Sequence, residues 1–301
     1  MLGFTLGRTL KRGIRLQRYK PLGQFASIGF VRYTHINTSY NNDLVTIESI
    51  PEQNTAIIHL HRAPANAFND EMVRTVTDVF TQIEKDKSVR TVIFASKIPK
   101  FFSAGVDLED FHRSGELWME FWRDLRTMFI TIHGSRLNTI AAVNGFAVGL
   151  GCALTLACQD RYMLSGKGAI GINPVNIGIP VPVWLVQRYV EVLGYRTSEK
   201  MLTAGVSLKA TEAKKIGLVD EIFDDHDQLL EACKKLAREK HKINETAQVE
   251  TARLLKVPFI KTFYSEEAED MERMAGFIER PEMRQIIKGM QAQIEAKKIK
   301  S

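Results

Sequence analysis

Cysteine is scarce in this sequence, and its three copies form no recognisable pattern. Cys152, Cys158 and Cys233 are odd in number and contain no Cys-x-x-Cys pair. This spacing indicates neither a disulfide framework nor a zinc site. The histidines are scattered and likewise lack a partner at ligand spacing. We therefore expect reduced core thiols and no metal centre.

Long apolar runs are also missing. The chain is 45% hydrophobic, but no run reaches the unbroken length that a membrane span needs. A length of 301 residues allows a sizeable core. The simplest organisation is one large α/β domain with a helical tail, because no internal repeat or low-complexity stretch divides the chain.

Acidic residues are absent from residues 1–40, where seven lysines and arginines occur among scattered leucines. This composition is typical of a mitochondrial presequence. The alternative is a basic arm that the working protein retains. Without these seven, 34 basic residues face 35 acidic ones, so the body is nearly neutral. A neutral body argues against nucleic-acid binding by the folded part.

Two glycine-bearing loops stand out in the body, at residues 103–107 and 144–151. Each follows a short apolar run typical of a buried strand, Thr91–Ala95 and Thr139–Val143. Glycine lets a backbone approach a ligand closely, and the N–H groups of Val106 and Leu150 each follow a glycine. Two such donors are able to hold one oxygen as an oxyanion hole, although tight strand-to-helix turns have the same glycines.

The segments FFSAGVDLED, AAVNGFAVGLGCALTLACQDRYML and GINPVNIGIPVPVW resemble the crotonase (enoyl-CoA hydratase/isomerase) superfamily in order and spacing. Within it, the chain most resembles the mitochondrial Δ3,Δ2-enoyl-CoA isomerases. The resemblance implies an α/β crotonase fold, a ββα spiral of two roughly perpendicular sheets surrounded by helices. It also implies a homotrimer in the mitochondrial matrix that takes CoA thioesters and needs no other cofactor.

The resemblance divides the chain into three parts. Residues 1–40 form the leader, 41–225 the spiral core, and 226–301 a helical region for trimer contacts and for covering the active site. Within the core we expect a β-hairpin at 44–61, a helix that Asn69 or Asp70 caps, and an amphipathic helix over Leu117–Ile132.

The resemblance also assigns site residues. Val106 and Leu150 become the oxyanion donors, and Asp107 orders the first loop. The remaining substrate-binding positions lie in the two loops, in the connection that borders the CoA adenine, and in an acyl-chain pocket: Ala104, Gly105, Gly149, Ala65, Ala67, Trp118 and Trp122. For the two tryptophans, a plain contact between helices is the alternative.

The acids of the family are missing from this chain. Pro174 stands where hydratases and isomerases have a glutamate, four residues before Gly178. Ala153 occupies the second hydratase position, and Pro182 occupies the position of an extra aspartate in dienoyl-CoA isomerases. None of these side chains is able to carry a proton.

Replacement bases are available nearby in the sequence. Glu109, Asp110, Glu116 and Glu120 follow the first loop, although such acids are more often solvated surface groups. Two hypotheses therefore stand. The chain is an enoyl-CoA isomerase-like enzyme of fatty-acid β-oxidation with an unrecognised base, or it is an inactive homologue that serves as a subunit of a larger mitochondrial assembly.

Overall fold

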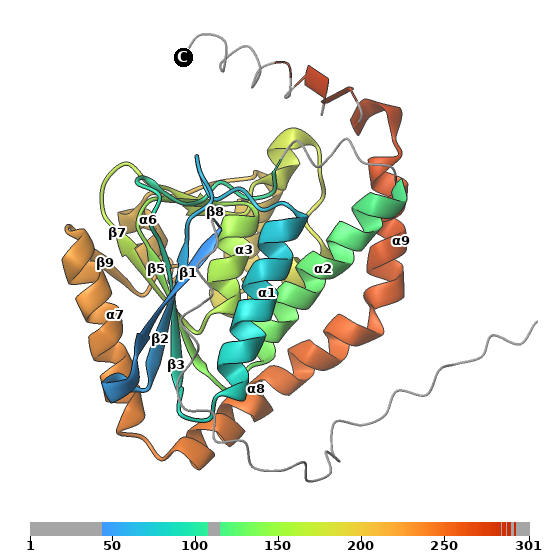
Figure 1. The fold of residues 1–301 in the computed structure, drawn as a ribbon. Helices are drawn as coiled ribbons and strands as arrows, with labels where there is room; N and C mark the ends of the chain where they lie inside the picture. Colours follow the sequence, from blue (N-terminus) through green and yellow to red (C-terminus); the bar gives the residue numbers. More distant parts are fainter. Residues whose placement is uncertain (1–43, 108–114, 284, 287, 290–291, 293–301) are drawn as a thin grey trace, which may run out of the picture. The chain divides into compact units, whose positions relative to one another are not determined.

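A six-stranded sheet forms the centre of the described chain (Figure 1). The computed structural model describes residues 44–107, 115–283, 285–286, 288–289 and 292, so the expected leader at 1–40 lies outside the described residues. The strands, in their order across the sheet, are β1 (Val45–Ile50), β2 (Thr55–Leu60), β3 (Thr91–Ser96), β5 (Asn138–Val143), β7 (Asp160–Leu164) and β9 (Glu221–Phe223).

The first two strands form the expected hairpin, with Val45 opposite Leu60 and Ile50 opposite Thr55. All other neighbouring strands of this sheet are parallel. Every residue of β2, β3 and β5 is buried, as strands covered on both faces require. Edge strand β1 instead carries partly exposed residues.

Helices cover both faces of this sheet. Phe94 and Ala141 pack on the face that holds α1 (Asp70–Lys85) and α2 (Gly115–Gly134), which lie side by side in Figure 1. Ile93 and Ile140, one residue away, point to the opposite face against α7 (His226–His241). The alternation of side chains along a strand therefore creates two separate apolar clusters.

The two expected helices begin near the predicted residues. Asn69 caps α1, since its side chain accepts a hydrogen bond from the Met72 N–H at 2.9 Å. The apolar stripe predicted for α2 is buried along its length. Both predictions are confirmed. The buried faces were predictable because a strong 3.6-residue period of apolar residues leaves little choice of which face is buried.

A second, three-stranded sheet within the described residues carries the glycine-bearing loops. Its strands are β4 (Phe101–Ser103), β6 (Phe146–Val148) and β8 (Ile170–Gly171), all parallel. Strand β6 leads through Gly149 into α3 (Leu150–Ala157), whose residues are all buried. This small sheet therefore sets the positions of both loops relative to each other.

The remaining helices follow in the second half of the chain. They are α4 (Val183–Leu193), α5 (Tyr195–Thr203), α6 (Ala210–Lys215), α8 (Glu245–Ser265) and α9 (Glu267–Ile278). None of the described helices has the length and apolar character needed to cross a membrane.

A buried ion pair fastens α9 to α2. The Arg126 guanidinium lies 2.7 Å from the Asp270 carboxylate, and both side chains are almost fully buried. Arg126 also donates to the Phe263 carbonyl at 2.8 Å and stacks over the ring of Phe263. Burying this pair is costly unless its hydrogen bonds are made, so these bonds hold α9 in one position against α2.

Candidate functional site

The first glycine-bearing loop makes a sharp turn after β4. Gly105 has a φ of +96°, a conformation that favours glycine, and a Cβ atom there would lie 2.9 Å from the Val148 carbonyl oxygen. The Ser103 hydroxyl accepts a hydrogen bond from the Gly105 N–H at 3.1 Å. The absence of a side chain at Gly105 therefore lets the first loop touch the second.

The second loop approaches the first from the other side. Gly149 has a φ of +55° and donates to the Gly171 carbonyl at 3.0 Å. A Cβ atom on Gly151 would lie 2.6 Å from the Ser103 carbonyl oxygen, so the start of α3 packs directly on the first loop. Both loops thus meet through glycine backbone.

Val106 and Leu150 present backbone N–H groups at this meeting point. Phe68 donates to the Gly105 carbonyl at 2.7 Å and accepts from the Asp107 N–H at 2.9 Å, so the Val106 N–H points away from Phe68. The Leu150 N–H is in the first turn of α3, where no helix carbonyl is available. Among the described residues, neither N–H donates a hydrogen bond.

One buried asparagine joins the residue 62–68 connection to the first loop. Asn66 is fully buried, and its carboxamide accepts from the Arg62 N–H at 2.8 Å and donates to the Ser96 hydroxyl at 2.8 Å. It also donates to the Phe102 carbonyl at 3.0 Å. The backbone carbonyl of Asn66 accepts from the Ser103 hydroxyl at 2.7 Å. Sequence reasoning missed this residue, although asparagine is enriched at positive φ, here +51°.

Asp107 has the loop-ordering contact that the family resemblance implies. Its carboxylate lies 2.7 Å from the Arg62 guanidinium, which also donates to the Ala67 carbonyl at 2.7 Å. The Ala65 carbonyl accepts from the Ala104 N–H at 2.9 Å. The predicted alanines thus lie where the connection and the first loop are hydrogen-bonded together.

The two positions of the family's acids lie beside the second loop but carry no charge. Ala153 is buried in α3, and its N–H donates to the Gly149 carbonyl at 3.0 Å. Pro174 begins a short 3-10 helix, Pro174–Ile177, that ends at Gly178 with a φ of +77°. Pro182 precedes α4 as its N-cap residue.

The C-terminal segment packs on this 3-10 turn. Met283 is buried, and its sulfur lies 3.3 Å from the position that a Cβ atom on Gly178 would occupy. The Cδ1 atom of Ile286 lies 3.0 Å from the same position. Residues near the chain end therefore contact the turn that contains Pro174.

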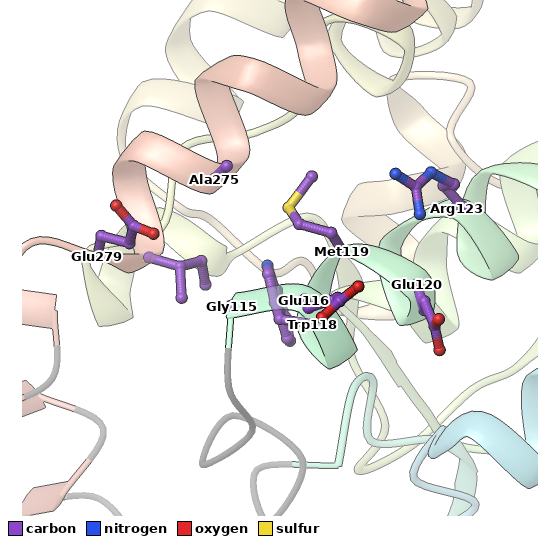
Figure 2. A pocket seen from close by; sticks show the side chains of 9 residues that line it. Gly115, Glu116, Trp118, Met119, Glu120, Arg123, Ala275 and Glu279 are labelled. Atoms are coloured by element: carbon purple, nitrogen blue, oxygen red, sulfur yellow. The ribbon is translucent and has the colours of Figure 1, made fainter.

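A cavity of about 490 Å³ lies between the beginning of α2 and the end of α9 (Figure 2). Trp118, Met119 and Ile278 contribute its apolar surface. Its other lining residues are Gly115, Glu116, Glu120, Arg123, Ala275 and Glu279.

Only some of the residues predicted to line the acyl-chain pocket or to act as a replacement base lie at this cavity. Trp118 lines it, whereas the Trp122 indole donates to the buried Asp270 carboxylate at 3.3 Å. Glu116 and Glu120 are at its edge, while Glu109 and Asp110 lie outside the described residues. Glu279, the residue that follows α9, also lines the cavity. It is far from α2 in the sequence, and no local pattern signals it.

The buried thiols and the buried histidine of α2 offer no nucleophile or base near neutral pH. Burial raises the pKa of Cys152 and of Cys158 to about 12, so both thiols stay protonated. Burial, together with Arg188 and Lys256, lowers the pKa of His133 to about 3 and keeps it neutral. Among the described residues, no three potential metal ligands gather.

Comparison with known proteins gives consistent matches. The profile of the enoyl-CoA hydratase/isomerase family matches residues 51–300. The rat protein enoyl-CoA delta isomerase 1, mitochondrial, is 28% identical over 271 residues, covering 89% of this chain and 91% of its own length. Its human counterpart is 28% identical over 188 residues, covering 62% of each chain.

Solved structures match the fold over most of the chain. Human mitochondrial delta3-delta2-enoyl-CoA isomerase superposes with a TM-score of 0.81 at 23% identity, covering 84% of this chain and 99% of that chain. Enoyl-CoA hydratase from Bacillus halodurans gives 0.75 at 22% identity, covering 81% and 99%. The α/β fold expected from the sequence is thereby confirmed.

The role of Asn66 predicts a specific pattern of instability. Asn66→Gly keeps a residue that tolerates the positive φ at this position but removes the side-chain hydrogen bonds. We therefore expect the free energy of unfolding to fall by about 2–3 kcal/mol. Asn66→Ala should lose about 1 kcal/mol more, because alanine is strained at positive φ. Denaturant unfolding of both variants measures this, with exposed Gln228→Ala as the control. Equal stability of wild type and Asn66→Gly would contradict this role of the network.

Proposed function

Because the chain belongs to the enoyl-CoA hydratase/isomerase family, we propose that it binds CoA thioesters of fatty acids as an enoyl-CoA isomerase-like protein of β-oxidation. The observation that carries the proposal is the pair of unused N–H groups on Val106 and Leu150, at loops joined through Gly105 and Gly149. Two such donors polarise a thioester carbonyl and hold the oxygen of its enolate.

The start of α3 strengthens this pair electrostatically. Leu150 is the first residue of the helix, so its N–H is among the donors that α3 itself leaves unpaired, at the positive end of the helix dipole. Negative charge developing on a thioester oxygen is stabilised there without any side chain having to move.

Besides the oxyanion donors, isomerisation requires a side chain that carries a proton. Moving a double bond from C3 to C2 takes a proton from C2 and returns it at C4, which needs a side chain that ionises. Pro174 and Ala153 do not ionise. This observation favours a second candidate function, in which the chain binds acyl-CoA without turnover as a structural or accessory subunit of a mitochondrial assembly.

We propose the cavity between α2 and α9 as the place of the acyl chain and of a replacement base. Trp118, Met119 and Ile278 supply apolar surface for an acyl chain within an otherwise polar lining. Glu116, Glu120 and Glu279 at its edge are the carboxylates that would have to replace the family's acid.

The proposed location is the mitochondrial matrix, and the proposed assembly is a homotrimer or a larger complex. The names of the rat, mouse and human relatives place those proteins in mitochondria, and the acid-free leader agrees with this location. Cell fractionation tests the location, and recovery outside mitochondria would overturn it.

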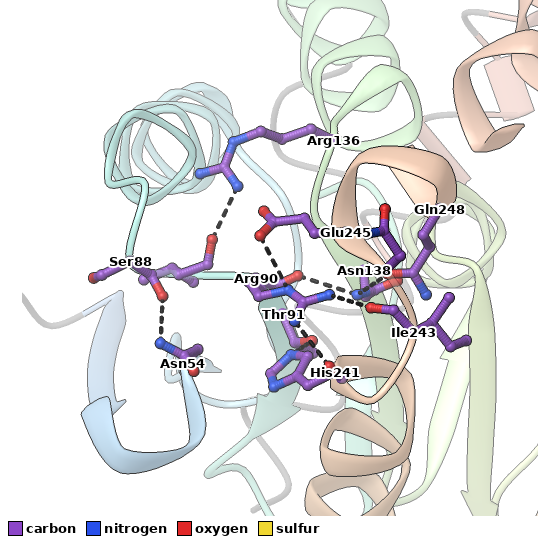
Figure 3. Close-up of polar contacts among 12 residues, drawn as sticks. Asn54, Ser88, Arg90, Thr91, Arg136, Asn138, His241, Ile243, Glu245 and Gln248 are labelled. Atoms are coloured by element: carbon purple, nitrogen blue, oxygen red, sulfur yellow. Dashed lines mark hydrogen bonds and ion pairs between the residues drawn. The ribbon is translucent and has the colours of Figure 1, made fainter. Parts of the chain in front are cut away.

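Exposed leucines on α8 support the assembly. Leu254 and Leu255 are 57% and 77% exposed. Leu255 lines a groove of about 400 Å³ together with Gln248 and Ile243, which is itself 52% exposed. Figure 3 shows Ile243 and Gln248 beside Asn138, at the junction of α7 and α8. Exposed apolar side chains that line one groove, as Leu255 and Ile243 do, are typical of a surface that another chain covers.

Light scattering tests the trimer. We expect the wild-type chain to have about three times the 34.1 kDa mass of one copy, and Leu255→Glu to shift it to the monomer, because a charge would be buried in the interface. Lys261→Glu, exposed elsewhere on α8, should leave the mass unchanged. A monomeric wild type would contradict the homotrimer.

Thioester binding predicts thermal protection. At about 100 times its Kd, hexanoyl-CoA should stabilise the wild-type chain by ~2.7 kcal/mol. Gly105→Ala should lose this protection, since its methyl group meets the Val148 carbonyl and displaces the first loop. Gly276→Ala, where a Cβ atom meets nothing within 4 Å, should keep it. Thermal unfolding with and without the ligand decides, and the absence of any wild-type shift would overturn the proposal.

Restoring the missing acid tests the chemistry. We expect Pro174→Glu to raise turnover of a 3-enoyl-CoA by at least ~10² over wild type, the gain typical of a positioned acid–base group. Pro174→Gln has similar size and no charge, so it should gain nothing. Wild-type turnover of ~1 s⁻¹ or more would instead exclude the non-catalytic function. Glu116→Gln, Glu120→Gln and Glu279→Gln would then identify the base.

A further inference from the structure

Two asparagines lie close to Pro174 in the sequence, Asn173 directly before it and Asn176 two residues after it, and their surroundings in the structure differ. The Asn176 carboxamide donates to the Gly205 carbonyl at 2.8 Å. Its Oδ1 lies 2.3 Å from the position that a Cβ atom on Gly205 would occupy. Asn176 therefore fills the space beside a glycine and ties the 3-10 turn to the segment after α5, which is a role in the fold.

Asn173 has no such partner. Its backbone carbonyl accepts from the Asn176 N–H at 3.1 Å, but its half-buried carboxamide makes no hydrogen bond with the described residues. A carboxamide offers two N–H donors and a carbonyl acceptor. These groups are therefore available to solvent or to a bound molecule.

The small sheet fixes where this carboxamide lies. Gly171 at the end of β8 is opposite Val148 at the end of β6, and the Gly171 carbonyl accepts from the Gly149 N–H. Two residues later, the Asn173 Oδ1 lies 3.6 Å from the position that a Cβ atom on Gly149 would occupy. Asn173 thus lies next to the residue that precedes the Leu150 N–H.

The chemistry of the carboxamide suits a thioester. Besides the Oδ1 atom near Gly149, the carboxamide has an NH2 group whose N–H donors are able to add to the backbone donors of Val106 and Leu150 at a thioester oxygen. The amide carries no net charge, so it does not oppose the negative charge of an enolate as a carboxylate would. Pro174 and Ala153, the two neighbouring positions of the family's acids, offer no polar side-chain atom.

We infer that the Asn173 carboxamide is a ligand-binding group of this site, which contacts the carbonyl of a bound CoA thioester, and that Asn176 is not. The inference rests on the proposed thioester binding and assigns a side chain to it. It also makes recognition of the carbonyl insensitive to pH near neutrality, because an amide does not titrate there.

A comparison of two probes tests the inference on the full chain. Hexanoyl-CoA has the carbonyl oxygen, whereas the thioether S-hexyl-CoA lacks it. Calorimetric titration of both gives a ratio of affinities that reports contacts to this oxygen. We expect Asn173→Ala to weaken hexanoyl-CoA binding by ~3- to 10-fold and to leave S-hexyl-CoA nearly unchanged, as the loss of one hydrogen bond predicts.

Two further variants keep the result interpretable. Asn173→Asp is isosteric but loses the N–H donor, so it should also lose the preference for the thioester. Asn176→Ala should lower the unfolding temperature and keep the wild-type ratio. If wild type binds neither probe, the proposed function fails. If wild type prefers the thioester and Asn173→Ala keeps that preference, only the role of Asn173 is overturned.

Discussion

The site depends on how one buried carboxamide joins segments that are distant in the sequence. Asn66 connects the residue 62–68 turn to the end of β3 and to β4, and all its side-chain hydrogen-bonding atoms are used inside the protein. A buried polar group that is fully paired holds its neighbours in one arrangement, since any other leaves donors and acceptors unpaired. The first loop, with the Val106 N–H, takes its position from this arrangement.

Helix α3 is short and apolar, but contacts at both of its ends fix its position. These contacts therefore also fix the direction of the Leu150 N–H. At its N-terminus, Gly149 and Gly151 let the backbone pack on the first loop. At its C-terminus, Arg188 donates to the Leu156 carbonyl at 2.8 Å and Arg161 to the Cys158 carbonyl at 3.2 Å. Cations at this end satisfy free carbonyls and oppose the negative end of the dipole.

Much of the central sheet and of α1 to α3 was predictable from the sequence. The spacing of apolar residues and capping residues such as Asn69 determine the type and the ends of these elements within a short stretch of chain. The small sheet was not, since a strand as short as Ile170–Gly171 has too few residues to show a period. The adjacent residues Asp160 and Arg161 form ion pairs with Lys240 and Asp220, partners that lie far away in the sequence and that no local pattern identifies. Glu279 reaches the cavity only through the packing of α9 on α2, and such tertiary contacts leave no local signal.

Met283 and Ile286, near the carboxyl end of the chain, contact Gly178 at the end of the 3-10 turn that contains Pro174. A truncation that removes Met283 and Ile286 therefore changes the surroundings of Pro174 as well as the chain terminus.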